Sequence, residues 1–290
     1  MGARAVSADP IPAALGRPIS GPSAVGGDWR RVVHLTRTLA VTDFKLRFFG
    51  SVLGYLWQLM RPLLLFGVLY AVFTRVLKFG AGVAFYPAIL LMNIVFFTFF
   101  SEATGGAVTS LVDRESLVRK IQFPRLVIPL ATVSTAGLNL VLNFVAVIVF
   151  MAIQGVGLHV TQLELPLIVA ALALFSAGVA AFLSAAYVRA RDVRPIWDVT
   201  IQMLYFATPV IYPYEAVVHR YNFRHIVYSN PLAVILQQAR HALVDPSAPS
   251  AVKAVGGWAW MAIPITIFVA VIVIGFWMFT REAPRVAEEL

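Results

Sequence analysis

Residues 127–153 read VIPLATVSTAGLNLVLNFVAVIVFMAI and contain no charged side chain. An apolar run of about 20 residues or more has the length of an α-helix that crosses the hydrocarbon core of a membrane. Further runs of this kind lie near 53–77, 85–110, 165–188, 195–213 and 257–280. We therefore predict an all-α membrane protein with six transmembrane helices.

The composition agrees with this prediction. Only 13% of the 290 residues are charged and 60% are hydrophobic, with a mean hydropathy of +0.82. An ordinary soluble protein has about 25% charged residues, so this class is excluded. The net charge of +9 comes from basic residues that are spread thinly between apolar runs, which indicates membrane orientation and not nucleic-acid binding. The chain has no cysteine, so disulfides, thiolate metal sites and cysteine nucleophiles are excluded.

The two ends of the chain differ from the spans between them. Residues 1–28 are rich in Ala, Gly, Pro and Ser, and we predict a disordered tail. Residues 29–48 place an apolar stripe opposite a basic face, which predicts an amphipathic interface helix in contact with membrane lipids. The alternative is an amphipathic helix packed on a partner protein. Residues 49–281 then form the transmembrane domain, and 282–290 form a second tail.

The distribution of Lys and Arg predicts the orientation. They gather before residue 52, in the loop between the second and third spans, in the loop between the fourth and fifth spans, and in the final tail. Cytoplasmic loops carry the excess of basic residues, so both termini are predicted to be cytoplasmic. An even number of spans agrees with this orientation.

The loop between the second and third spans mixes charged and apolar residues. Asp113 is placed to cap a short helix that Pro124 ends. Apolar side chains among charges are typical of a segment that fits into a groove on another protein. The alternative is a solvated connector. The residues that would make such a contact are Asp113, Glu115, Leu117, Arg119, Lys120, Ile121 and Phe123.

The segment between the fifth and sixth spans has apolar periodicity in two pieces, 214–227 and 231–244, separated by Asn230 and Pro231. Neither piece is long enough to cross a membrane, so we predict two short re-entrant or interfacial helices at the outer face. The tyrosines of this region are an aromatic belt at the interface or the lining of an exit. They are Tyr212, Tyr214, Tyr221 and Tyr228.

Catalytic and nucleotide-binding motifs are absent from the sequence. It has no Walker-type Gly-Lys-Ser/Thr loop, no HExxH, no GxSxG and no Asp-x-Asp, and its five histidines are scattered. We therefore predict no catalytic residue, no metal site and no cofactor bound by this chain. Glu102 is the acidic residue that lies deep in an apolar run. A carboxylate inside a membrane is a functional candidate, and the alternative is a structural hydrogen bond to a neighbouring helix.

Four segments occur in a recognisable order around the six spans. They are FKLRFFGSVLGYLWQLMRPLL at 44–64, VRKIQFPRLVIP at 118–129, RARDVRPIWDVTIQMLYFATPVIYP at 189–213 and NPLA at 230–233. In this combination the chain resembles, over about residues 29–281, the membrane subunit of type-2 ABC exporters of lipid-linked polysaccharides. The resemblance implies a homodimeric permease in the bacterial inner membrane, above a dimer of a separate ABC ATPase that binds ATP and Mg.

The resemblance also implies roles for the segments described above. The loop at 113–123 and the helix at 29–48 would contact the ATPase, and the two short outer helices would form a gate. The cargo would be a polysaccharide on an undecaprenyl or decaprenyl diphosphate, of O-antigen, teichoic acid or galactan type, and the Ala-, Val- and Arg-rich composition favours a galactan. The alternatives are an exporter of a drug or small lipid and a membrane enzyme of lipid-linked sugar metabolism.

A cargo of this kind needs cations at its entrance and polar or aromatic groups along its path. Arginine suits a diphosphate because its guanidinium binds two oxygens together, although such residues also snorkel to lipid phosphates. The predicted entrance residues are Arg47, Arg61, Arg189, Arg191 and Arg194. The predicted path residues are Glu102, Trp197, Gln202 and Tyr205. The phenylalanines at 96, 97, 99 and 100 are assigned to core packing or lipid contact, because four positions within five residues cannot all face one pore.

Overall fold

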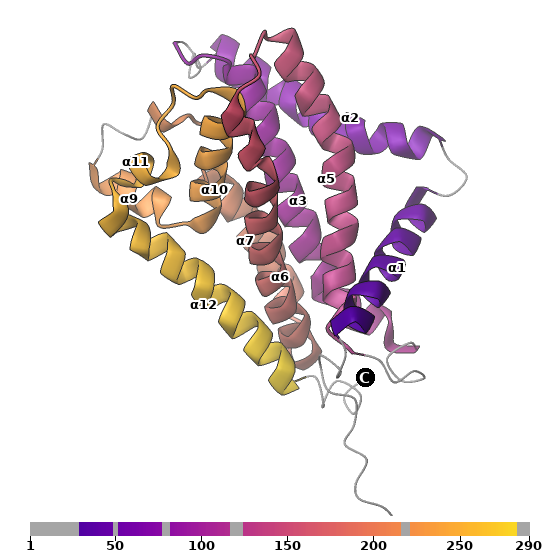
Figure 1. Cartoon of the computed structure of the whole chain (residues 1–290). Helices are drawn as coiled ribbons and strands as arrows, with labels where there is room; N and C mark the ends of the chain where they lie inside the picture. The colour runs from indigo at the N-terminus through magenta and orange to yellow at the C-terminus, as the bar shows by residue number, and fades with distance from the viewer. Residues whose placement is uncertain (1–28, 49–51, 77–81, 117–123, 216–220, 283–290) are drawn as a thin grey trace, which may run out of the picture.

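The structure, a computed structural model, describes residues 29–48, 52–76, 82–116, 124–215 and 221–282. The described residues form helices and connecting turns, with no β-strand among them. The long helices form an elongated bundle, and several short helices pack beside the start of the last long one (Figure 1). The prediction of an all-α protein is confirmed.

The long helices follow the predicted apolar runs. They are α1 (Trp29–Phe48), α2 (Val52–Tyr70) with its π-helical continuation η1 (Ala71–Val76), α3 (Tyr86–Asp113), α5 (Val127–Ile153), α6 (Leu165–Arg189) after the 3-10 turn η2 (Val160–Glu164), α7 (Val193–Ala207) and α12 (Trp258–Glu282). Within the described residues, five helices are long and apolar enough to cross a membrane. They correspond to all the predicted spans except the fifth.

The helix predicted at 195–213 is shorter than expected. The helix α7 has 15 residues and ends at Ala207, because Thr208 adopts an extended conformation with φ −91° and ψ 143°. Thr208 precedes Pro209, whose ring disfavours helical torsion angles in the residue before it. At 1.5 Å per residue, α7 is about 22 Å long, less than a hydrocarbon core of about 30 Å.

The helix α3 lies at the centre of the bundle. In the most apolar stretch of α3, 78% of the residues are buried in the protein, compared with 11% in the corresponding stretch of α2 and 17% in that of α12. The phenylalanines at 96, 97, 99 and 100 are all buried in the core, as predicted. A helix that is apolar on every side belongs in a core. The apolar surfaces of α2 and α12 therefore remain available to lipid or to another chain.

The helices α6 and α12 approach each other most closely at two glycines. A Cβ atom added to Gly275 would lie 2.0 Å from the carbonyl oxygen of Gly178. Small residues at such a crossing let helix backbones approach closely, as is common in membrane bundles. This contact fixes α12 against the rest of the bundle.

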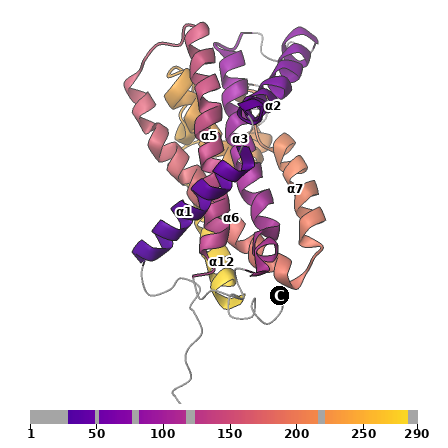
Figure 2. The same cartoon turned by 90° about the vertical axis from the view of Figure 1, so that its right-hand side faces the viewer.

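The described chain begins and ends on the same side of the bundle. Val32 near the start of α1 and Phe279 near the end of α12 belong to one buried cluster, together with the start of α5 (Figure 1). The helix α1 crosses α5 obliquely (Figure 2) and buries Val32 and Ala40. Leu35 and Leu39 of the predicted apolar stripe pack against this cluster, and the basic face of α1 is exposed. The cytoplasmic location of this side stays a prediction.

The short helices lie at the other end of α12. They are α9 (Tyr221–Tyr228), α10 (Pro231–Ala239) with its π-helical continuation η3 (Arg240–Val244), and α11 (Ala251–Val255). Asn230 caps α10 by accepting a hydrogen bond from the backbone N–H of Leu232 at 3.0 Å. The predicted piece 231–244 is helical, and the piece 214–227 is helical at Tyr214, at Glu215 and from Tyr221 onward among the described residues. The helix α11 was not predicted, and the position of these helices at the outer face stays a prediction.

Candidate functional site

Three helices meet at the carboxylate of Glu102 in α3. The side-chain amide of Gln58 in α2 donates a hydrogen bond to its Oε1 at 3.1 Å, and the amide of Asn139 in α5 donates to its Oε2 at 2.8 Å. A carboxylate away from bulk water needs such donors. The structural hydrogen bonds considered for Glu102 in the sequence are therefore present, and they tie α2 and α5 to the central helix.

Glu102 also lies at the inner end of a cavity of about 310 Å³, which we call the polar groove. Along α3, the lining positions 102, 106, 109 and 113 recur every three or four residues, so they share one face of the helix. The helices α1 and α5 form the other walls. The lining residues are Asp43, Arg47, Glu102, Gly106, Thr109, Ser110, Asp113, Arg114, Thr132, Thr135 and Ala136.

An ion pair joins two of these walls. The Nη2 atom of Arg114, which follows α3, donates to the carboxylate of Asp43 in α1. Asp113 was predicted to cap a short helix, most of which lies outside the described residues, so this capping role stays a prediction. Asp113 is the last residue of α3, and its carboxylate accepts a hydrogen bond from the hydroxyl of Thr109 at 2.7 Å. The helix runs three residues further than the apolar run because a polar residue can continue an exposed helix end.

Most of the predicted ATPase contact is not within the described part of the chain. Asp113 is exposed and Glu115 is partly buried, so both lie at the end of the bundle where the chain begins. Contact of this loop with an ATPase stays a prediction. The residues outside the described ranges are Leu117, Arg119, Lys120, Ile121 and Phe123.

The predicted entrance arginines are divided between three places. Arg47 lines the polar groove, and Arg61 is exposed on α2. The others lie at the turn between α6 and α7. There Arg189 pairs with Glu282 of α12 at 3.3 Å, and Arg194 pairs with Asp198 at 3.2 Å. Arg191 lies 5.0 Å from the centre of a tyrosine ring in α6.

The predicted path residues of α7 do not share one face. Trp197 packs edge-on against Phe100, with ring centres 6.3 Å apart, and Tyr205 packs against Phe97 at 5.0 Å. Gln202 is exposed and packs against neither ring. The indole N–H of Trp197 and the hydroxyl of Tyr205 are buried without a hydrogen-bond partner among the described residues. The helix α7 therefore presents aromatic rings to α3 and keeps its amide outside.

Comparison with known proteins identifies the architecture. The family model described as ABC-2 type transporter matches residues 34–244. The chain belongs to the ABC-2 type transporter family. This confirms the resemblance inferred from the sequence, and it makes the chain a multi-pass membrane protein of a transport system, which in bacteria lies in the inner membrane.

Relatives of this ABC-2 subunit carry a more specific name. An O-antigen export system permease protein, RfbA, from Klebsiella pneumoniae is 26% identical over 251 residues, which are 86% of this chain and 92% of the relative. A second RfbA from the same organism is 25% identical over 204 residues, 70% of this chain and 77% of the relative. The RfbA of Myxococcus xanthus is 26% identical over 214 residues, 74% of this chain and 82% of the relative.

The tyrosines predicted to form a gate in the ABC-2 subunit have different surroundings. Tyr212 is partly buried and donates to the backbone carbonyl of Ala207 at 3.1 Å, and burial raises its pKa to about 12. Tyr228 is completely buried and donates to the side chain of Gln237 at 3.3 Å. Tyr214 lies against it with ring centres 6.0 Å apart. The side chain of Tyr221 is outside the described part. Tyr212 and Tyr214 thus remain candidates for a surface that a cargo touches, whereas Tyr228 supports them from the core.

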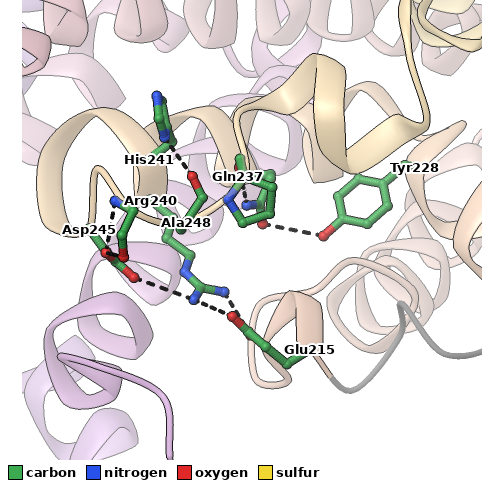
Figure 3. A network of polar contacts seen from close by, with 9 residues as sticks. Glu215, Tyr228, Gln237, Arg240, His241, Asp245 and Ala248 are labelled. Atoms are coloured by element: carbon green, nitrogen blue, oxygen red, sulfur yellow. Dashed lines mark hydrogen bonds and ion pairs between the residues drawn. The ribbon is translucent and has the colours of Figure 1, made fainter.

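The sequence analysis missed an ion cluster around a buried arginine beside these tyrosines, in which Glu215 is exposed (Figure 3). Arg240 is 3% exposed and binds both carboxylate oxygens of Glu215, at 2.7 and 3.0 Å, while Asp245 lies 3.7 Å away. Burial alone raises the pKa of Glu215, but hydrogen bonds from Arg240 and its positive charge outweigh this effect and lower the pKa. The position of Arg240 inside the apolar piece 231–244 could have indicated this cluster, because a buried guanidinium group needs an acidic partner.

The described residues contain no group of three or more His, Asp or Glu arranged to hold a metal ion.

Proposed function

We propose that this ABC-2 subunit is the permease of an ATP-driven exporter of a cell-envelope polysaccharide. The cargo would be linked to an undecaprenyl or decaprenyl diphosphate and would move from the cytoplasm to the outer face of the membrane. The names of the relatives support an O-antigen-type polysaccharide, since the matches cover most of this chain and most of the relatives' own length. The galactan type is favoured by the Ala-, Val- and Arg-rich composition alone. The short helix α7 would serve as the sixth crossing, with both termini in the cytoplasm.

The polar groove is the structural observation that carries this proposal. Carboxylates, guanidinium groups and hydroxyls line it, and it reaches from the end of α3 to Glu102 inside the bundle. A polar wall at this depth is costly unless it serves a pathway or a site. An exporter of an apolar drug or a small lipid, the alternative, would favour an apolar cavity instead. A membrane enzyme would need a catalytic constellation, which the sequence lacks.

The exposed surface of α7 supports a homodimer. Its apolar side chains at 196, 199, 203 and 206 are 64%, 57%, 68% and 68% exposed, and they recur at helical spacing on one face. Exposed apolar stripes of this kind mark contacts with lipid or with protein. A two-fold dimer that brings two α7 helices together would place the cargo path between the subunits, with the exposed Gln202 near it and with Trp197 and Tyr205 holding α7 against α3. A dimer of a separate ABC ATPase would bind at the cytoplasmic end.

The remaining predicted residues fit this assembly. Arg61, with the three arginines at the turn between α6 and α7, would attract the diphosphate at the cytoplasmic entrance, whereas Arg47 lies in the polar groove. The loop at 113–123 and α1 would receive the movement of the ATPase. The tyrosines Tyr212 and Tyr214 would lie at the outer exit.

Reconstitution tests the function directly. The subunit is purified together with its proposed ABC ATPase partner, placed in liposomes, and supplied with a polyprenyl-diphosphate-linked glycan. We expect glycan to become accessible on the far side only with ATP, and native mass measurement to give two permease and two ATPase chains. ATP-dependent movement of an apolar dye but not of the glycan would contradict the proposal.

A further inference from the structure

The walls of the polar groove are rich in hydrogen-bond acceptors. The hydroxyl protons of Ser110 and Thr135 are donated to backbone carbonyls of their own helices at 2.8 and 2.9 Å, and that of Thr109 to Asp113 at 2.7 Å. Thr132 donates to a carbonyl of α5 at 3.3 Å. Each hydroxyl oxygen keeps a lone pair that can accept a further hydrogen bond. The groove therefore offers accepting oxygens along its whole length.

The charges of the groove point the same way. Asp43, Glu102 and Asp113 stand against Arg47 and Arg114, so the lining is net negative. Arg114 is moreover partly neutralised by its ion pair with Asp43. A diphosphate would meet more negative charge than positive charge here, and the groove is not suited to it. An uncharged group that carries many N–H or O–H donors is suited to it.

Two groups at the groove still have hydrogen-bonding capacity. The carboxylate of Glu102 accepts from Gln58 and Asn139, but a carboxylate has about four lone-pair sites. The Nη1 atom of Arg114 is buried and has no hydrogen-bond partner among the described residues. A bound ligand would have to supply a hydrogen-bond acceptor for the Nη1 protons of Arg114 and hydrogen-bond donors for the carboxylate of Glu102.

The length of the groove limits the size of the ligand. From Glu102 to Asp113 the helix α3 advances eleven residues, which is about 16 Å at 1.5 Å per residue. Gly106 lies between them and keeps the groove open, because a Cβ atom there would lie 3.0 Å from the methyl group of Thr132. The groove is long enough for a sugar ring with its substituents.

We propose that the polar groove binds a neutral sugar residue of the glycan cargo through its hydroxyl groups. Glu102 accepts hydrogen bonds from hydroxyls at the inner end, the free N–H groups of Arg114 donate to a sugar oxygen near the mouth, and the threonine and serine oxygens accept along the wall. This subsite rests on the proposed export of a polysaccharide. It assigns recognition of the sugar to the groove and leaves the diphosphate to arginines outside it.

Saturation-transfer NMR on the purified permease–ATPase complex in nanodiscs tests the subsite. The probes are galactose, glucose, mannose and N-acetylglucosamine, with ethanolamine and inorganic diphosphate as competitors. We expect at least one sugar to receive saturation and to be displaced by neither competitor. Glu102→Gln should weaken its binding about tenfold, the usual effect of losing a hydrogen bond to a charged group.

Matched glycine variants separate the groove from general damage. Gly106→Val fills the groove and should abolish the sugar signal. Gly105→Val makes the same change one residue earlier, at a position where an added Cβ meets nothing within 4 Å, and should leave the signal unchanged. Size-exclusion profiles and melting temperatures show whether each variant is folded. If Glu102→Gln does not fold, the glycine pair decides the question.

Several results would overturn the subsite. They are no saturation of any sugar, equal signals in Gly106→Val and in the wild type, or displacement of the sugar by ethanolamine or diphosphate. Export in liposomes is measured with the same preparations. Export without sugar binding in the groove would reject the subsite and keep the proposed function, whereas sugar binding without ATP-dependent export would reject the proposed function.

Discussion

Replacing Gly275 with alanine should separate α6 from α12. The added Cβ would lie 2.0 Å from the carbonyl oxygen of Gly178 and 2.8 Å from its carbonyl carbon. Carbon and oxygen atoms in favourable contact are about 3.3–3.6 Å apart, so the two backbones must move apart by about 1.3 Å or more. The obstructing atoms belong to the backbone and cannot rotate away, as a flexible side chain would.

The expected loss of stability follows from this geometry. Overpacking in a tight interior costs about 1–3 kcal/mol, and we expect the upper end because neither helix can relieve the contact locally. With only 17% of its apolar window buried, α12 has few other contacts to hold it. Gly105→Ala is the matched control, since its Cβ would meet nothing within 4 Å, and alanine stabilises a helix interior by about 0.5–1 kcal/mol.

Reversible unfolding in mixed detergent micelles measures both variants. We expect Gly275→Ala to unfold at a lower denaturant fraction than the wild type, and Gly105→Ala to unfold at an equal or higher one. If Gly275→Ala were as stable as the wild type, the close crossing of α6 and α12 would be refuted.

Three further predictions concern other parts of the chain. The pKa of Glu215 is lower in the folded protein than its ordinary value of 4.5. The contribution of Glu215 to the free energy of unfolding is therefore complete above pH 4.5 and is lost as the pH falls through the lower pKa of the folded state. Melting curves from about pH 6 to about pH 3 should show this loss in the wild type and not in Glu215→Gln. The purified chain without a partner should hydrolyse no ATP above background in a phosphate-release assay, because it has no Walker loop. Phe123→Ala should weaken the binding of the ATPase by about 2 kcal/mol, as truncation of an aromatic anchor commonly does, and should therefore reduce the stimulation of ATP hydrolysis by the permease. Membrane insertion should stay normal. Unchanged stimulation would show that the loop is only a connector.

The long helices were well predicted from the sequence because each of them coincides with a continuous apolar run. Residues 127–153 became α5 with the same bounds, and the second, fourth and sixth runs changed by a few residues at their ends. The fifth run is helical only as far as Ala207 because Thr208 and Pro209 stop the helix, although the following residues are apolar, so its crossing of the membrane stays a prediction. A local backbone preference decided this end, and hydropathy does not report it.

The polar sites were harder to predict because their partners are distant in the chain. Glu102 was singled out, but Gln58 and Asn139 lie 44 and 37 residues away, and no local pattern pairs them with it. Arg240 and Glu215 are 25 residues apart, on elements whose mutual packing depends on the whole bundle. A buried charge in a sequence thus predicts that a partner exists, and only the fold identifies which residue it is.

The shortness of α7 has a consequence for the bilayer itself. A helix of about 22 Å is shorter by about 8 Å than a hydrocarbon core of about 30 Å. Lipids beside a short segment thin or rearrange, at a modest free-energy cost for each ångström of mismatch. In the proposed dimer, where two such helices would face each other, the insulating layer between the two aqueous compartments would be at its thinnest. The transmembrane electric field would then be steepest beside α7, and charges placed there would respond most strongly to the membrane potential.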